Sequence, residues 1–141
     1  MIKFYLGILF ILQCFIGFSQ SAAEVEIRKV LSNQTESWNK GDLVSFMNGY
    51  WKSDSLIFVG KDGITYGYQN TLNNYKKNYA NQDQMGSLHF KLLHINKLSD
   101  EYYQVIGQWH LFRKVGDVSG YFTVLFRKIQ NKWLMVSDHS S

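Results

Sequence analysis

Apolar residues recur at helical spacing in three segments of the first half of the chain. Between residues 22 and 39 they fall at steps of three, four and seven, which predicts an amphipathic helix with Ile27, Val30, Leu31 and Trp38 on one side. Gly41 can end this helix in the left-handed conformation, and Asp42 is a suitable N-cap for a short second helix. Further apolar positions mark the second and third helices: Leu43, Phe46, Met47, Tyr50 and Trp51, then Tyr68, Leu72, Tyr75 and Tyr79.

The remaining pattern is typical of β-strands. Two short β-rich runs, residues 56–59 and 64–66, flank a Gly-bounded turn and predict a hairpin. After Gly86 four longer runs follow, at residues 87–97, 102–113, 121–130 and 133–139, separated by short turns. They predict an antiparallel meander. Because the helices come first and the strands second, we expect an α+β fold in which the helices pack on one face of a curved antiparallel sheet and close a cone.

The first 19 residues have the pattern of a secretory signal peptide. One cation, Lys3, precedes an apolar run of 15 residues from Phe4 to Phe18, and the small residues Gly17 and Ser19 end it. The run is shorter than the ~20 residues that span a bilayer. We therefore expect residues 1–19 to be removed and the protein to be periplasmic or secreted, with no stable membrane anchor.

Composition and charge fit one globular domain over residues 20–141. Hydrophobic residues make up 45% of the chain and charged residues 18%, which excludes a disordered or low-complexity protein. The one cysteine, Cys14, lies in the expected signal peptide, so the mature chain has no thiol for a disulfide, a nucleophile or a metal site. The net charge of +4 is dispersed in pairs of cations. Nucleic-acid binding needs a clustered basic stripe, so we expect no nucleic-acid partner.

Short motifs along the chain carry a family resemblance by their order: Trp38-Asn39-x-Gly41-Asp42, Tyr50-Trp51, Met85-Gly86-x-Leu88-x-Phe90, Gly107-x-Trp109, Gly120-x-Phe122-Thr123, Lys128, and Trp133-x-x-x-x-Asp138-His139-x-Ser141. Over residues 24–141 the chain resembles the bacterial "domain of unknown function 4440" family of the SnoaL-like, nuclear-transport-factor-2-like superfamily. This resemblance implies a cone-shaped α+β fold and frequent dimerisation through the sheet. It implies no single activity, because ketosteroid isomerases, polyketide cyclases and non-catalytic binding domains all belong to the superfamily.

One departure from the isomerase relatives is visible in the sequence. Those relatives place a general-base carboxylate near the end of the first strand, whereas residues 56–59 here are all apolar. Proton abstraction next to a carbonyl needs a positioned acceptor. A base would therefore have to come from another part of the chain.

Asp138 and His139 are the candidate catalytic residues. Neighbours in an extended strand point to opposite faces, so at most one of them faces the interior. In the functional interpretation, one lines a pocket as a proton acceptor or orienting group. In the structural interpretation, both close the last strand, with Asp138 accepting hydrogen bonds and His139 packing on an aromatic ring.

His89 and His110 raise the question of a metal site. A symmetric turn at Ser99-Asp100 places them directly opposite each other on one face of the sheet, whereas a bulge at Gly107 would place His89 against Trp109. Cysteine is absent from the mature chain and no Asp or Glu lies at ligand spacing. We therefore expect no metal.

Aromatic residues on the inward stripes define the candidate ligand site. Buried tyrosine hydroxyls need hydrogen-bond partners, and hydroxyls that converge in an apolar cavity can hold a small ligand. A filled core is the alternative. Tyr50 and Tyr75 are the preferred polar contacts, and the full set of expected ligand-binding residues is Trp38, Tyr50, Phe58, Tyr75, His89, Trp109 and Phe122.

The sequence thus favours an exported domain, homodimeric, that binds a small and mostly apolar ligand. Two alternatives stay open: an isomerase, cyclase or hydrolase-like enzyme acting on a small carbonyl compound, and a non-catalytic interaction module. The chain has no Gly-x-Ser-x-Gly elbow, so the sequence does not indicate Ser-His-Asp nucleophilic catalysis. It also has no phosphate-binding loop. We expect no cofactor.

Overall fold

The computed structural model describes residues 20–141, so the expected signal peptide, with Cys14, lies outside the described residues. Along the chain the elements are α1 (Ala22–Asn39), α2 (Leu43–Phe46), the 3-10 turn η1 (Met47–Gly49), β1 (Ile57–Gly60), β2 (Gly63–Tyr66), α3 (Tyr68–Asn78), α4 (Gln82–Met85), β3 (Ser87–Lys97), β4 (Tyr102–Phe112), β5 (Val118–Ile129) and β6 (Lys132–Ser140). The three expected helices and six expected strands are present. The short helix α4 was not expected.

Helix α1 begins and ends where its sequence predicts. The Ser21 hydroxyl accepts a hydrogen bond from the backbone N–H of Glu24, and Gly41 ends the helix with a φ of 76°. The Asp42 carboxylate accepts from the backbone N–H of Ser45 at 2.9 Å and caps α2. The buried side of α1 consists of Ile27, Leu31, Gln34 and Trp38.

The six strands form one sheet in the order β2-β1-β6-β5-β4-β3. The expected meander is present, but the sheet is mixed, because β1 pairs with β6 in parallel. The expectation of an antiparallel sheet was wrong at this point. In the sequence, the β1–β2 hairpin lies between η1 and α3. Its strand β1 pairs with β6, the last strand of the meander, and not with β3, the first.

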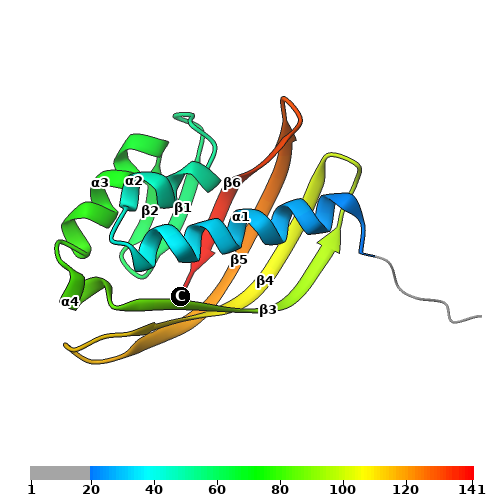
Figure 1. The fold of residues 1–141 in the computed structure, drawn as a ribbon. Helices are drawn as coiled ribbons and strands as arrows, with labels where there is room; N and C mark the ends of the chain where they lie inside the picture. Colours follow the sequence, from blue (N-terminus) through cyan, green and yellow to red (C-terminus); the bar gives the residue numbers. More distant parts are fainter. Residues whose placement is uncertain (1–19) are drawn as a thin grey trace, which may run out of the picture.

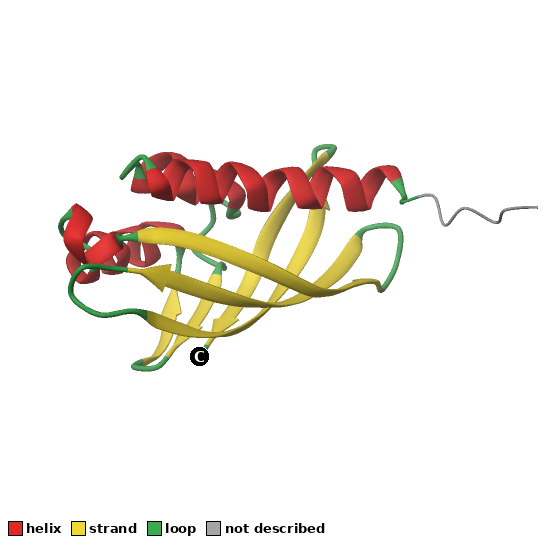
Figure 2. Ribbon diagram, turned by 60° about the horizontal axis from the view of Figure 1, so that its bottom comes forward, coloured by secondary structure: helices red, strands yellow, loops and turns green. Residues whose placement is uncertain are grey.

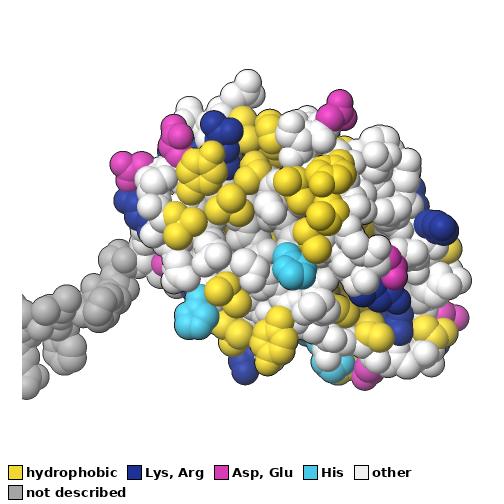
Figure 3. All heavy atoms as spheres, turned by 180° about the vertical axis from the view of Figure 1, so that it is seen from behind, with side chains coloured by type: hydrophobic (Ala, Val, Ile, Leu, Met, Phe, Trp, Pro, Cys, Tyr) yellow, Lys and Arg dark blue, Asp and Glu magenta, His cyan; other side chains and the backbone are white. Residues whose placement is uncertain are grey.

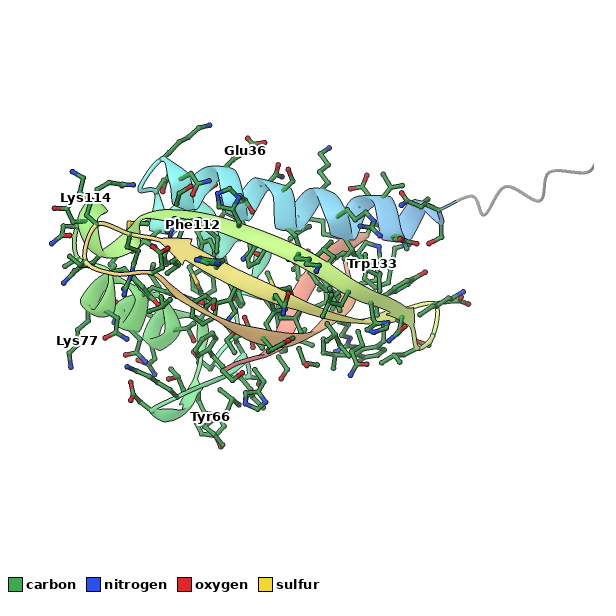
Figure 4. All side chains as sticks on the ribbon, turned by 90° about the horizontal axis from the view of Figure 1, so that it is seen from below. Glu36, Tyr66, Lys77, Phe112, Lys114 and Trp133 are labelled. Carbon is green, nitrogen blue, oxygen red and sulfur yellow. The ribbon has the colours of Figure 1, made fainter. Side chains whose placement is uncertain are left out.

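The helices cover one face of the sheet. Figure 1 shows α1 crossing in front of the long strands, with α2 and α3 gathered over the β1–β2 end, and Figure 2 shows the strands bending beneath the helical layer. The hydrophobic core lies between the two layers. Trp133 points into it, while Tyr66 on β2 points away from α1 (Figure 4). Along residues 20–141 no helix combines the length and the apolar character needed to cross a bilayer.

Two irregularities change which side chains face the core. The β3–β4 register shifts between Leu92 and His94, and the β5–β6 register shifts between Leu125 and Phe126, opposite Val136. Each β-bulge reverses the inward and outward alternation of one strand. Gly107, expected as a bulge, is regularly paired. Its missing side chain leaves the space that the Phe122 ring occupies.

Candidate functional site

Asp138 faces the interior because of the bulge in β6. Trp133 and Met135 are buried on the core side of this strand, and regular alternation would continue that side with Ser137 and His139. The extra residue, Val136, reverses the alternation, so Asp138 is buried instead, at 4% exposure. His139 is exposed on the outer face, opposite Thr123 and Val59.

The buried Asp138 carboxylate accepts two hydrogen bonds from hydroxyl groups. Tyr50 donates to Oδ2 at 2.6 Å, and Ser140 donates to Oδ1 at 2.9 Å. The Tyr50 hydroxyl also lies 3.4 Å from that of Tyr75, on α3. Three segments far apart in sequence therefore form one hydrogen-bonded chain, Tyr75–Tyr50–Asp138–Ser140, which we call the hydroxyl chain.

Burial changes the ionisation of every titratable member of the hydroxyl chain. Loss of solvent raises the pKa of Asp138 from 3.8 to about 6, although the hydrogen bonds from Tyr50 and Ser140 and the nearby His139 act in the opposite direction. Burial, and then the Asp138 charge, raise the pKa of Tyr50 and of Tyr75 well above 10. The two tyrosines therefore stay protonated at neutral pH, and Asp138 is the member that titrates.

Aromatic rings surround the Tyr75 end of this chain. The Tyr75 ring lies in the middle, with centroids of Phe46 at 5.2 Å, Phe58 at 5.7 Å and Trp38 at 6.0 Å. All three contacts are edge-to-face, an arrangement that aromatic pairs prefer. We call the set the aromatic cluster: Trp38, Phe46, Tyr50, Phe58, Tyr75 and Tyr79.

The structure brings together part of the expected ligand-binding set. Trp38, Tyr50, Phe58 and Tyr75 all belong to the aromatic cluster, next to Asp138. Phe122 pairs with Ser140 across β5 and β6, so it borders the other end of the hydroxyl chain. It also packs on Phe90, 5.3 Å away.

Trp109, His89 and His139 lie outside the aromatic cluster and the hydroxyl chain. Trp109 is on the inner face of β4, paired with Phe90 on β3, and its indole N–H has no partner among the described residues. His89 is exposed on the outer face, directly opposite His110 as the symmetric register predicts. His89 and His139 are therefore not part of the interior site, because strand alternation points both away from it.

Two hollows lie near the candidate site, and one of them touches the aromatic cluster through Tyr79. One of about 410 Å³ lies across β3, β4 and β5, and another of about 440 Å³ lies between α2 and α4; none of Tyr50, Tyr75 and Asp138 lines either. The rings of Phe58 and Tyr75 are half-buried, so they are the part of the site that a ligand could contact first. Within residues 20–141 no group of three His, Cys, Asp or Glu side chains is placed to hold a metal.

The hydroxyl chain has two arrangements of its hydrogens. When Asp138 is ionised, Tyr50 donates to it, and Tyr75 is able to donate to Tyr50. When Asp138 is protonated, its O–H can donate to the Tyr50 hydroxyl. Tyr50 can then donate to Tyr75, and the Tyr75 hydrogen is free to point away from the chain. In that state the chain presents a donor to the acceptor oxygen of a bound molecule. Protonation of Asp138 thus reverses the direction of hydrogen-bond donation along the hydroxyl chain.

Ser140 is the member of this site that sequence reasoning missed. It is two residues beyond Asp138 on the same face of β6, which is the spacing of side-chain neighbours in a strand. That spacing is visible in the sequence. The spacing identifies Ser140 as a hydrogen-bond partner in the site only when Asp138 is known to point inward.

Comparison with solved structures identifies the fold family. A nuclear-transport-factor-2-like protein of unknown function from Shewanella oneidensis is 37% identical, with a TM-score of 0.81, and the match covers 84% of this chain and 98% of that one. A ketosteroid isomerase-like protein from Erwinia carotovora has 12% identity and a TM-score of 0.68, over 86% of this chain and 97% of its own. A nuclear-transport-factor-2-like superfamily protein from Salmonella enterica has 17% identity and a TM-score of 0.65, over 85% and 92%.

The other two comparisons gave no match. No protein-family model matches the chain, so the finer resemblance to the "domain of unknown function 4440" family is not confirmed. No curated protein matches it. The Shewanella protein is similar enough, over nearly its full length, to establish the broader family. The chain belongs to the nuclear-transport-factor-2-like proteins.

Proposed function

We propose that this protein, after export through the signal peptide expected at residues 1–19, binds a small and mostly apolar molecule that carries one hydrogen-bond acceptor oxygen. The observation that carries the proposal is the hydroxyl chain, in which Tyr75 and Tyr50 connect the aromatic cluster to the buried Asp138. Aromatic walls with a few convergent polar groups are the usual composition of a small-molecule site.

Tyr75 is the expected contact for the ligand oxygen. Its side chain is half-buried, whereas Tyr50 and Asp138 behind it are fully buried. The half-buried Phe58 ring packs against Tyr75 and forms the adjacent wall. A ligand that displaces these two rings slightly would place its oxygen at the Tyr75 hydroxyl and its apolar part against Phe58.

A matched pair of ligands tests this role of Tyr75. Acetophenone and ethylbenzene have similar shapes, but only the ketone has an acceptor oxygen. We expect the protein to prefer acetophenone by about threefold to tenfold, the value of one hydrogen bond. Tyr75→Phe should abolish this preference while it keeps the ring. NMR titration of the purified protein with each compound, at a pH below the Asp138 pKa of about 6, measures the two affinities.

Tyr79→Phe is the control for this experiment. Tyr79 belongs to the same helix end and the same aromatic cluster, but its hydroxyl is not part of the hydroxyl chain. It should retain the preference for the ketone. If Tyr75→Phe retains the preference as well, or if neither compound binds at millimolar concentration, the ligand-binding proposal is wrong and the filled core of an interaction module is the better interpretation.

An enzyme acting on a small carbonyl compound is the second candidate function. It is favoured by the pKa of Asp138, about 6, which suits a proton acceptor at neutral pH. Exchange of the acetophenone methyl protons in D₂O distinguishes the two functions. Exchange that the protein accelerates, and that Asp138→Asn abolishes, would establish catalysis. Binding without such exchange would leave a binding domain.

We further propose that two copies associate through the outer face of the sheet. Ile57 and Tyr66 pair across β1 and β2 on this face and are 37% and 59% exposed. Figure 3, which views the molecule from the side opposite α1, shows hydrophobic side chains in several patches there. Contiguous exposed apolar surface marks association sites.

Substitution of Ile57 tests the association. Ile57→Asp should shift a dimer toward monomer in light scattering, because it places a charge in an apolar contact. Val25→Asp is the control, since Val25 is also an exposed apolar residue, at 49%, but lies on α1. A monomeric wild-type protein, or a dimer that Ile57→Asp leaves intact, would contradict this interface.

A further inference from the structure

The outer face of the sheet carries a second cluster of polar side chains, far from the hydroxyl chain. Three neighbouring strands contribute two adjacent rows to it. His89, His110 and Ser119 are directly paired across β3, β4 and β5, and so are Lys91, Gln108 and Tyr121. Strand alternation puts all six side chains on the outer face, because Leu88, Leu111 and Phe122 beside them are buried on the inner face.

These six residues line one hollow of about 410 Å³, which we call the outer-face hollow. Its volume lies in the range of small-molecule sites, roughly 300–1,000 Å³. Lys91 supplies a permanent positive charge, and the two imidazoles, the amide, the hydroxyl and the phenol supply hydrogen-bond donors. None of the six is acidic. The composition of the hollow therefore favours an anion.

An aromatic ring forms one wall of the outer-face hollow. Phe112 lines it and stacks on His110, with centroids 3.8 Å apart and planes 12° apart, while His89 meets the same ring edge-on at 5.1 Å. These contacts hold both imidazoles in place. Tyr121, 57% exposed, provides a second aromatic surface. A flat ligand has two rings against which it can lie.

One ring nitrogen in the outer-face hollow has no hydrogen-bond partner among the described residues. The Nε2 atom of His110 is buried and makes no hydrogen bond within residues 20–141. The nearest carboxylate oxygen, Oδ2 of Asp117, is 3.6 Å away, too far for a hydrogen bond. Asp117 is already engaged through Oδ1, which accepts from the backbone N–H of Arg113 at 2.8 Å. A buried polar atom without a partner is costly, and an acceptor oxygen of a ligand would satisfy Nε2 in the state in which it carries a hydrogen.

We propose that the outer-face hollow binds a small aromatic carboxylate. The carboxylate is held by Lys91 and the imidazole N–H groups, and the ring lies against Phe112 and Tyr121. This site is separate from the interior one, because the sheet lies between them. It is also separate from the Ile57–Tyr66 pair, which lies on β1 and β2 beyond β6.

Benzoate is the probe for this site, and benzamide is its uncharged counterpart. Wild-type protein should bind benzoate, measured by isothermal titration, and bind benzamide at least about tenfold more weakly, since a hydrogen bond to a charged group is worth about tenfold or more. Lys91→Gln should lower the benzoate affinity by about tenfold for the same reason. Added salt should weaken binding in the wild type and much less in this variant.

Lys77→Gln is the control variant. Lys77 is an exposed lysine on α3, away from the strands that form the hollow (Figure 4). Its substitution should leave benzoate binding unchanged. Failure of the wild type to bind benzoate at millimolar concentration, equal binding of benzamide, or unchanged affinity in Lys91→Gln would each overturn the proposal. None of these results bears on acetophenone binding at Tyr75.

Discussion

Replacement of Asp138 by asparagine should remove a pH dependence of about 3 kcal/mol from the stability of this protein. The folded-state pKa of Asp138 is about 6, against 3.8 for an unperturbed carboxyl. Between these two values the folded protein holds a proton that the unfolded chain has released. The free energy of unfolding attributable to Asp138 therefore falls as the pH rises through this window, by about 1.4 kcal/mol per unit.

Urea unfolding from about pH 4 to about pH 8 measures this effect as the difference between wild type and variant. The two proteins should have similar stability at the acid end. Above the window Asp138→Asn should be the more stable, because it places no charge in the interior. Asp62→Asn, at the exposed β1–β2 turn, is the control and should follow the wild type. An Asp138→Asn variant that parallels the wild type throughout would contradict the expected ionisation.

The second large effect is expected at Gly86, where α4 passes into β3. Its φ of 63° and ψ of −148° lie in a region that only glycine adopts readily. A Cβ at this position would also overlap the backbone carbonyl of Phe112 on β4. Because neither backbone can move without breaking the β3–β4 pairing, Gly86→Ala should cost about 3–4 kcal/mol of stability.

Gly116→Ala separates the two causes. Gly116, in the β4–β5 turn, also has a positive φ, 105°, but a Cβ there would meet no atom within 4 Å. It should cost only the backbone strain, about 1–2 kcal/mol. If urea unfolding gives equal losses for the two variants, the close approach of Gly86 to Phe112 does not constrain the fold.

Most of the fold follows from local sequence signals. The helical steps of Ile27, Leu31 and Trp38, together with Gly41 and Asp42, fix α1 and its end. The parallel pairing of β1 with β6 could not be predicted in this way. It joins residues about eighty positions apart, and no local pattern distinguishes it from a free-standing hairpin. Helix α4 escaped prediction because its polar sequence has no buried stripe; only the Asn81 cap marks it.

The site was harder to predict than the fold, and one bulge explains why. The sequence names Asp138 and His139 as neighbours on opposite faces, but a strict alternation from Trp133 and Met135 would bury His139. Val136 adds one residue to the strand, so Asp138 is buried and His139 is exposed. A bulge depends on how two strands fit together, so one strand's sequence does not reveal it.

The pairing of His89 with His110 also depends on a bulge that the sequence does not reveal. His89 and His110 are paired as the symmetric register predicts, yet the turn itself is offset by one residue, since Lys97 pairs with Tyr103. The bulge after Leu92 removes that offset before the strands reach His89. The pairing was therefore predicted correctly although the turn register was not.

The most direct test of the hydroxyl chain is a site-resolved NMR titration of the Asp138 carboxyl carbon. The structure predicts a midpoint near 6 in the wild type. Tyr50→Phe should raise the midpoint further, because it removes the hydroxyl that donates to the carboxylate at 2.6 Å. A midpoint below 4, or one that Tyr50→Phe leaves unchanged, would contradict a buried carboxyl coupled to Tyr50 and Tyr75.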